Sequence, residues 1–283
     1  MQHFLSGLSF GLLLFLISSG LTITFGMMRL LNLSHGAIYT ISAYIGIEFL
    51  DTGMPYWVAF VVTVVLVAIA GMALERLLLH RFIDSILAQI VATVGVGLII
   101  GDLILAKYRG LPILPSRPPG MSGATRIFGS YFPKLRIALI IVGVVVALLL
   151  WLLLSKTQVG AMVRAAVDDR EIARSIGVPV PKLFTGVFGF GAGLAAFAGI
   201  WGGAFSGLGP GIADRMLLLA VVIVVLGGLG SLKGAFIASI LVGLVNQYGI
   251  VFFPQFAQFA LYVPVAIFLA FRPQGLFGRI GVS

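Results

Sequence analysis

Residues 4–28 read FLSGLSFGLLLFLISSGLTITFGMM and contain no acidic or basic side chain. A helix that crosses about 30 Å of hydrocarbon needs roughly 20 consecutive apolar residues, because its backbone groups must bond internally where there is no water. No Lys or Arg precedes Arg29, and no small-residue cleavage site follows the run, so it does not resemble a removable secretory signal. We interpret this stretch as a first membrane span.

The composition of the whole chain also predicts a membrane protein. Of 283 residues, 60% are hydrophobic and 10% charged, and the mean hydropathy is +1.16, whereas about a quarter of the residues in soluble domains are charged. The net charge of +9 is better explained by cytoplasmic anchoring charges than by a nucleic-acid partner. With no cysteine and three scattered histidines, we expect no zinc or redox centre and no cofactor on this chain.

The same length criterion predicts an all-α, polytopic fold with about nine spans, give or take one. The expected spans are residues 4–28, 36–50, 55–74, 86–106, 137–154, 183–205, 216–229, 234–252 and 256–271. Glycines and Pro210 after the sixth span indicate a re-entrant or loop segment there. The loop at residues 107–136 contains Pro112, Pro115, Pro118 and Pro119, so it cannot be regular helix throughout.

The distribution of Lys and Arg favours an external N-terminus and a cytoplasmic C-terminus. With residues 155–182 placed inside, alternation of nine spans puts 11 of the 18 basic residues on the cytoplasmic side. Six of the others lie in the loop at residues 107–136, which opposes this orientation. The preference for this topology is therefore modest.

The polar interval at residues 155–182 is patterned as helices and not as a simple connector. Asp168 and Glu171 have the spacing of a capping box, and Gly177 followed by Pro179 supplies a stop signal. These signals predict a short helix at about Asp169–Ile176, with Ile172 and Ile176 on one face and Arg170 and Arg174 on another. Such a helix is either an amphipathic element lying on lipid or a protruding element for a soluble partner.

The residues of this interval resemble those of a known protein family. GAMVRAA at residues 160–166, the pair Asp168-Asp169 and IARSIGV at residues 172–178 resemble the cytoplasmic coupling loop of ABC importer permeases, more narrowly the branched-chain amino acid type. Three further stretches agree: GLTITFGMMR (20–29) with NLSHGA (32–37), the glycine-rich residues 190–203, and VLGGLGS (225–231) with Gly234-Ala235. The proline-rich residues 111–120 match no motif of that family.

The resemblance implies a non-catalytic permease subunit of a bacterial cytoplasmic (inner) membrane importer. Its implied partners are a second, similar permease, two cytoplasmic ATPase subunits that hold ATP and Mg²⁺, an extracytoplasmic substrate-binding protein, and membrane lipid. The absence of a G-x-x-x-x-G-K-[ST] motif agrees with ATP hydrolysis on separate subunits. The resemblance assigns ATPase coupling to Gly160, Arg164, Ala165, Asp168, Asp169, Glu171, Ile172, Ala173, Arg174, Ile176 and Gly177.

Polar residues within or between the spans are the candidates for the translocation pathway. They are Asn32, Ser34, His35, Glu48, Asp102 and Asn246. An intramembrane carboxylate is by default a functional hypothesis, but Glu48 and Asp102 lie near span ends, where they could instead reach water or pair with Lys107 or Arg109. The turn at residues 32–35 could equally be an interfacial loop, and Asn246 a polar helix tip.

A stripe of small residues recurs every four positions from Gly191 through Ala195, Gly199, Gly203 and Gly207 to Gly211. Small residues on one ridge allow helices to approach closely in lipid. This ridge suits either static packing or a sliding interface.

Two other classes of function compete with the importer. A stand-alone secondary carrier would usually have ionisable coupling groups near the membrane midplane, and none is evident. An intramembrane enzyme would need a catalytic constellation within the spans, and the sequence offers none. We expect transport of branched-chain amino acids or of related small amides and carboxylates, with selectivity resting largely on the binding protein.

Overall fold

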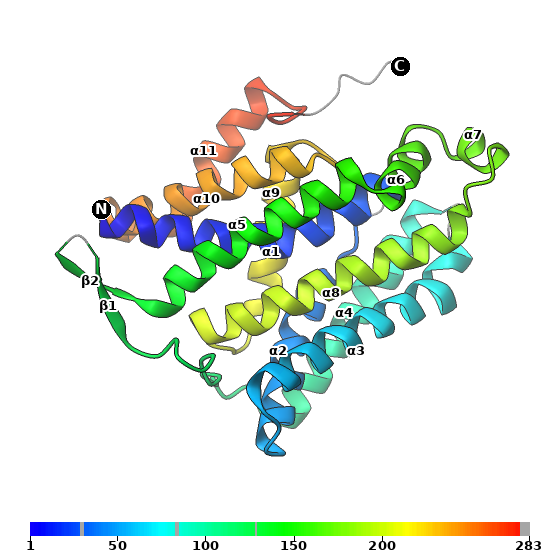
Figure 1. Cartoon of the computed structure of the whole chain (residues 1–283). Coiled ribbons are helices and arrows are strands. Elements are labelled where there is room, and N and C mark those ends of the chain that lie inside the picture. The colour runs from blue at the N-terminus through cyan, green and yellow to red at the C-terminus, as the bar shows by residue number, and fades with distance from the viewer. Residues whose placement is uncertain (29–30, 83–84, 128, 278–283) are drawn as a thin grey trace.

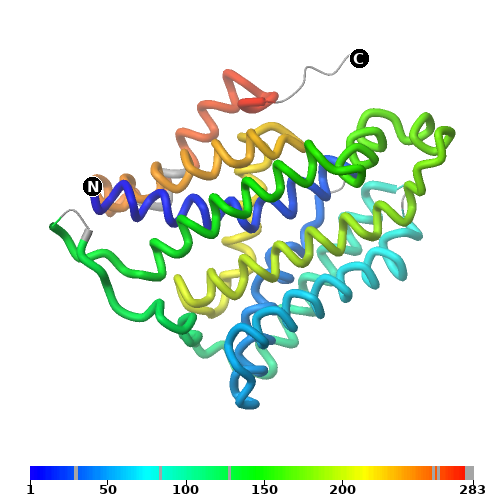
Figure 2. The backbone as a smooth tube through the Cα atoms, viewed as in Figure 1, coloured from blue at the N-terminus to red at the C-terminus, as the bar shows by residue number. Residues whose placement is uncertain are grey.

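A computed structural model describes residues 1–28, 31–82, 85–127 and 129–277. The chain forms a bundle of helices that run mostly lengthwise beside one another (Figures 1 and 2). The elements in chain order are α1 (Gln2–Met28), α2 (His35–Asp51), α3 (Tyr56–Leu77), η1 (Leu79–Phe82), α4 (Ile86–Tyr108), β1 (Ala124–Ile127), β2 (Ser130–Pro133), α5 (Lys134–Lys156), α6 (Gln158–Asp168), α7 (Arg170–Ser175), α8 (Val180–Ser206), α9 (Ile212–Gly227), α10 (Leu232–Phe252), η2 (Pro254–Phe256) and α11 (Ala257–Phe271).

An α-helix lies at each of the nine ranges that the apolar runs mark out, with bounds that differ by a few residues. Within the described ranges, six helices are long and apolar enough to cross a membrane, namely α1, α3, α4, α5, α8 and α10. The other three, α2, α9 and α11, have 17, 16 and 15 residues, fewer than the roughly 20 that a full crossing needs. The polytopic membrane fold is thus confirmed, while nine crossings stays a prediction.

The fold is mostly helical, as predicted, and one short β-hairpin lies in the loop between α4 and α5. In the loop between α4 and α5, β1 and β2 pair as an antiparallel hairpin with Thr125 opposite Phe132 and Arg126 opposite Tyr131. Threonine and aromatic side chains suit such cross-strand pairs, and the prolines that precede β1 keep helix from forming there. The hairpin lies at the opposite end of the bundle from α6 and α7 (Figure 1).

The burial pattern separates core helices from peripheral ones. In the most apolar 18-residue stretch of each helix, the buried share of residues is 89% in α1 and 67% in α8. The corresponding shares in α3, α4 and α5 are 22%, 11% and 17%. In lipid an apolar side chain need not be buried in protein, so exposed apolar faces such as those of α3, α4 and α5 suit contact with acyl chains. α1 and α8 form the protein interior around which the other helices pack.

The small-residue ridge of α8 packs against α1 and α2. A Cβ added to Gly191 would lie 2.6 Å from Thr24 Cγ2 of α1, and one added to Gly199 would lie 2.0 Å from the carbonyl oxygen of Tyr39 in α2. Helices this close exclude any side chain larger than hydrogen at the crossing. The ridge ends before its last two members, because α8 stops at Ser206, and Gly207 and Gly211 lie in the link to α9.

The two short helices α2 and α9 begin beside each other in the interior. His35 Nε2, at the start of α2, lies 3.0 Å from the carbonyl oxygen of Ile17, a residue in the middle of α1. A Cβ added to Gly36 would lie 2.1 Å from the carbonyl oxygen of Ala213 in the first turn of α9. Both short helices therefore start about halfway along the long helix α1.

Candidate coupling site

The polar interval folds as two helices, and the first, α6, begins directly after α5. The Thr157 hydroxyl caps α6 by accepting a hydrogen bond from the Gly160 backbone N–H at 3.1 Å. A Cβ added to Gly160 would lie 2.4 Å from the carbonyl oxygens of Leu153 and Leu154, so the sharp turn between α5 and α6 needs a glycine. Val163 and Ala166 are buried against the bundle, which fixes α6 across its end.

The second helix, α7, is capped one residue later than the sequence pattern predicts. The Asp169 carboxylate, and not that of Asp168, accepts hydrogen bonds from the backbone N–H groups of Glu171 and Ile172, at 2.8 and 3.0 Å. Asp168 is instead the last residue of α6. The prediction that Asp168 caps the helix was therefore wrong. The chain breaks between α6 and α7 at Asp169, so Asp169 occupies the N-cap position of α7.

Both ends of α7 are fixed, and its outer side is apolar. Gly177 adopts a left-handed conformation with φ of +90°, and the Val178 N–H bonds back to the Ala173 carbonyl, which ends the helix as predicted. Ala173 is 1% exposed, while Ile172 and Ile176 are 61% and 69% exposed. The predicted apolar face is thus exposed, and α7 lies at the end of the bundle (Figure 1).

Arg170 joins α7 to the two core helices. Its guanidinium donates a hydrogen bond to the carbonyl oxygen of Met27 at the end of α1, at 3.3 Å, and lies 4.9 Å from the ring centroid of Phe184 in α8. Arg170 and Arg174, which the sequence places on one helix face, differ in burial: Arg170 is half-buried and Arg174 is exposed. The sequence of so short a helix does not predict this contact, because the contact depends on how α7 packs against α1 and α8.

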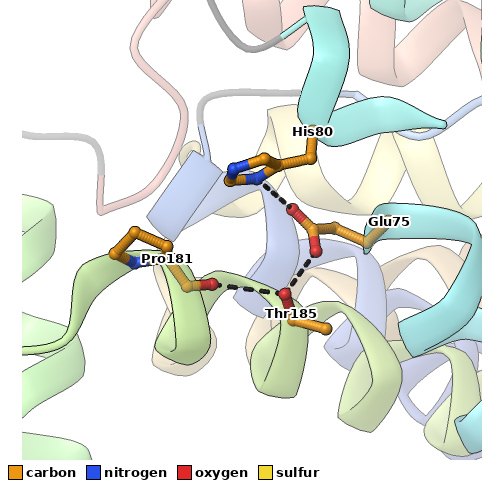
Figure 3. Close-up of polar contacts among 4 residues, drawn as sticks. All are labelled: Glu75, His80, Pro181 and Thr185. Atoms are coloured by element: carbon orange, nitrogen blue, oxygen red, sulfur yellow. Dashed lines mark hydrogen bonds and ion pairs between the residues drawn. The ribbon is translucent and has the colours of Figure 1, made fainter. Parts of the chain in front are cut away.

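A buried carboxylate ties the start of α8 to α3. Glu75 is 0% exposed. Its Oε2 accepts a hydrogen bond from the Thr185 hydroxyl at 2.5 Å, and its Oε1 lies 3.3 Å from His80 Nδ1 (Figure 3). Thr185 also lies 3.2 Å from the Pro181 carbonyl oxygen. A buried carboxylate is costly without such partners. Glu75 is not among the residues predicted from the sequence, where its signal is an acid directly after an apolar run.

The predicted coupling residues all lie in α6, in α7 or at their ends, and two of them, Gly160 and Ala173, are buried. Gly160, Arg164, Ala165 and Asp168 belong to α6, and Asp169, Glu171, Ile172, Ala173, Arg174, Ile176 and Gly177 belong to α7 or its caps. α8 begins at Val180, a few residues beyond α7. The arrangement is a capped, protruding helix anchored to α1 and α8 by Arg170, and such an element can transmit force from a bound partner to the bundle.

The structure brings together three of the six pathway candidates. Asn32, Ser34 and His35 are all buried, at 2%, 0% and 1% exposed. The Asn32 side-chain oxygen accepts from the Ser34 hydroxyl at 2.6 Å and from the Ser34 N–H at 3.1 Å. The turn is therefore a hydrogen-bonded polar cluster inside the protein, about halfway along α1.

The other three candidates lie elsewhere. Glu48, near the end of α2, forms an ion pair with Lys107 at 2.8 Å and accepts from the Tyr108 hydroxyl, which is the pairing that the sequence offered as its alternative. Asp102 is exposed on α4, and Asn246 is half-buried on α10, beyond Leu244, which packs against Gly7 of α1. These residues do not join the polar turn.

Comparison with known proteins gives one family for nearly the whole chain. Residues 3–271 match the family described as branched-chain amino acid transport system / permease component. The high-affinity branched-chain amino acid transport system permease protein BraD of Pseudomonas aeruginosa is 26% identical over 299 residues, covering 99% of this chain and 96% of BraD. LivH of Escherichia coli K12, which has the same descriptive name, is 25% identical with the same coverage.

A more distant relative has a different named role. The autoinducer 2 import system permease protein LsrD of Yersinia pseudotuberculosis is 26% identical over 247 residues, covering 82% of this chain and 68% of LsrD. No solved structure matches the chain.

Proposed function

Because the chain belongs to the family of branched-chain amino acid transport system permease components, we propose that the solute it carries is a branched-chain amino acid or a related small amide or carboxylate. Two relatives of nearly full length are named for branched-chain amino acid transport. The relative named for autoinducer 2 import shows that permeases similar to this chain are not limited to amino acids. The permease role follows from the family, and the solute is the proposal.

The partner that drives this permease is, in our proposal, a cytoplasmic ATPase subunit that docks on α6 and α7. The observation that carries this is the exposed pair Ile172 and Ile176 on a capped helix, whose other side is tied to the core by Arg170. Two ATPase subunits would serve this chain and a second, similar permease, and they would hold the ATP and Mg²⁺. Docking would then shift the population between inward-open and outward-open states.

The proposed orientation places α6 and α7 in the cytoplasm, the N-terminus outside and the C-terminus inside, with nine crossings. The β1–β2 hairpin lies at the far end of the bundle (Figure 1), and would face the extracytoplasmic binding protein. The Lys and Arg distribution supports this orientation.

The solute pathway, in the same proposal, passes the polar turn formed by Asn32, Ser34 and His35. Short helices that start at mid-depth direct their positive N-terminal ends towards anionic substrate groups in several transporter folds, and α2 and α9 start in this way. In this proposal Glu48, Asp102 and Asn246 would line the external entrance.

Uptake measurements distinguish the importer from a stand-alone carrier. Expressed from its native locus, the chain should copurify with a nucleotide-binding subunit, and leucine uptake should stop when ATP is depleted while the proton gradient is kept. Uptake that persists without ATP would favour the carrier.

Side-specific labelling tests the orientation, and the absence of native cysteine makes it clean. Arg164→Cys and Arg174→Cys should react with a membrane-impermeant maleimide in inside-out vesicles only. Tyr131→Cys, at a residue of β2 that is 73% exposed, is the matched control and should react in right-side-out vesicles only. Labelling of Arg174→Cys from the outside would contradict the docking proposal.

A further inference from the structure

A large groove runs along one side of α1, and the function proposed above assigns it no occupant, although Arg164 and Asp168 of α6 line one end of it. Its volume is about 1350 Å³, beyond the roughly 300–1,000 Å³ of ordinary small-molecule pockets. One wall is a face of α5 that includes Val144, Leu148 and Trp151, and the opposite wall is the start of α10 with Phe236 and Ile237. The groove therefore lies between two helices that both pack on α1.

The groove changes from apolar to charged along its length. Its deep end reaches Phe15, near the middle of α1, and its walls there are apolar. The other end carries Arg164 and Asp168 of α6, Lys233 of α10 and the serines Ser155 and Ser231. Both cations are exposed, and with the one carboxylate they leave a net positive mouth.

This profile matches one kind of molecule, a lipid with its tails in the bilayer and its head group at the surface. Trp151 lies on the same wall just before the polar end, and tryptophan is enriched at the level of the head groups. Basic pockets between membrane helices on the cytoplasmic side bind anionic head groups. We propose that this groove binds an anionic phospholipid from the cytoplasmic leaflet, with its phosphate between Arg164 and Lys233 and its acyl chains along α5 and α10.

A solute route fits the groove less well. A path for a polar amino acid needs hydrogen-bonding groups along its depth, and the polar side chain at depth, Thr22, already donates its hydroxyl to the Ser18 carbonyl at 2.7 Å. A helix of the second permease could fill an apolar groove, but it would not account for two cations at one end. The lipid assignment rests on the proposed orientation, in which α6 is cytoplasmic.

Photocross-linking in nanodiscs tests the assignment. The full-length chain, purified with its partner subunits, is placed in phosphatidylcholine doped with phosphatidylglycerol that carries a diazirine on one acyl chain. Cross-links should map to Leu148 and Phe236. In the double variant Arg164→Gln/Lys233→Gln the affinity for phosphatidylglycerol should fall by roughly 30-fold, or about 1 kcal/mol for each cation.

The matched control removes two exposed cations from the hairpin end, Arg117→Gln/Arg126→Gln, and should leave the cross-links unchanged. A diazirine-labelled phosphatidylcholine that reacts equally well, in both the parent and the Arg164→Gln/Lys233→Gln variant, would overturn the head-group site. A disulfide between Leu148→Cys and the second permease would also overturn it, because the groove would then be a protein interface. The assay needs no ATP or solute, so its failure would leave the coupling proposal intact. Failed side-specific labelling would contradict the docking proposal, and of the lipid proposal it would remove only the cytoplasmic source of the lipid.

Discussion

Replacing Ile172 or Ile176 by aspartate should separate ATP hydrolysis from solute uptake. Both side chains are largely exposed on α7, at 61% and 69%, so a charge at either position meets water in the isolated permease. Surface substitutions of this kind usually change the free energy of unfolding by about 0.5 kcal/mol or less. Membrane insertion and thermal stability of the permease should therefore be close to those of the parent chain.

The effect on docking should be much larger than the effect on folding. Burying a whole isoleucine side chain contributes about 1.5–3 kcal/mol. Because Ile172 and Ile176 are still largely exposed, burial against an ATPase subunit should stabilise the complex by roughly 1–2 kcal/mol for each residue. Loss of one residue should weaken docking by roughly 5- to 30-fold, and loss of both by roughly 30- to 1,000-fold. Desolvation of the new carboxylate would add to this.

The assay uses purified complex in proteoliposomes and measures solute uptake and ATP hydrolysis side by side. Solute uptake should fall steeply in Ile172→Asp and Ile176→Asp, while any residual ATP hydrolysis should no longer respond to solute and binding protein. Pull-down of the ATPase subunit by the permease reports docking directly.

Two controls make the result specific. Ile172→Val keeps an apolar surface and should couple normally. Tyr131→Asp places the same charge on an exposed residue of β2 at the other end of the bundle and should leave ATPase docking unchanged. Normal uptake in both Ile172→Asp and Ile176→Asp would refute docking on α7.

Three further pairs of substitutions test the supports of this site. Glu75→Ala removes the buried carboxylate together with its contacts to Thr185 and His80, and should lower the free energy of unfolding by about 1–3 kcal/mol. Thr185→Val should cost about 1.5–3 kcal/mol, because the buried carboxylate loses one hydrogen bond. Both are measured as thermal unfolding in detergent. Gly199→Ala should destabilise by about 1–3 kcal/mol because its Cβ would overlap a backbone carbonyl, while Gly186→Ala on the same helix meets open space and should be neutral or slightly stabilising. Asp169→Ala removes the N-cap of α7 and should lower the free energy of unfolding by about 0.5–2 kcal/mol and speed amide hydrogen exchange in α7. Asp169→Asn keeps a capping oxygen and should do neither. Equal exchange rates in the two variants would show that the cap is dispensable.

The helices could be predicted from sequence because uncharged apolar runs determine their positions. The run at residues 4–28 became α1, and even the split of residues 234–271 at Pro254 matches the break between α10 and α11. The end of α7 could also be predicted, because Gly177 takes the left-handed conformation that its position requires. Such features depend on the local sequence alone.

Features that depend on tertiary contacts could not be predicted. Glu75 reads as a polar residue after a span, and only the packing of α3 on α8 brings Thr185 to its carboxylate. Arg170 and Arg174 have the spacing of one helix face, yet the approach of α1 selects Arg170 alone for the Met27 carbonyl. The depth at which α2 begins could not be predicted from its length either, because a short apolar run can begin at either surface or in the interior.

α1 is the element that connects the docking helix with the polar turn. Its last residues carry the carbonyl of Met27, which accepts from Arg170 of α7, and its middle carries the carbonyl of Ile17, which lies against His35. The two contacts are about 15 Å apart along the helix axis at 1.5 Å per residue. α1 is also the most deeply buried of the long helices, and packed interiors transmit displacement with little compression. In the proposed function, an ATPase that moves α7 therefore acts on the polar turn through one rigid helix, without touching the solute pathway.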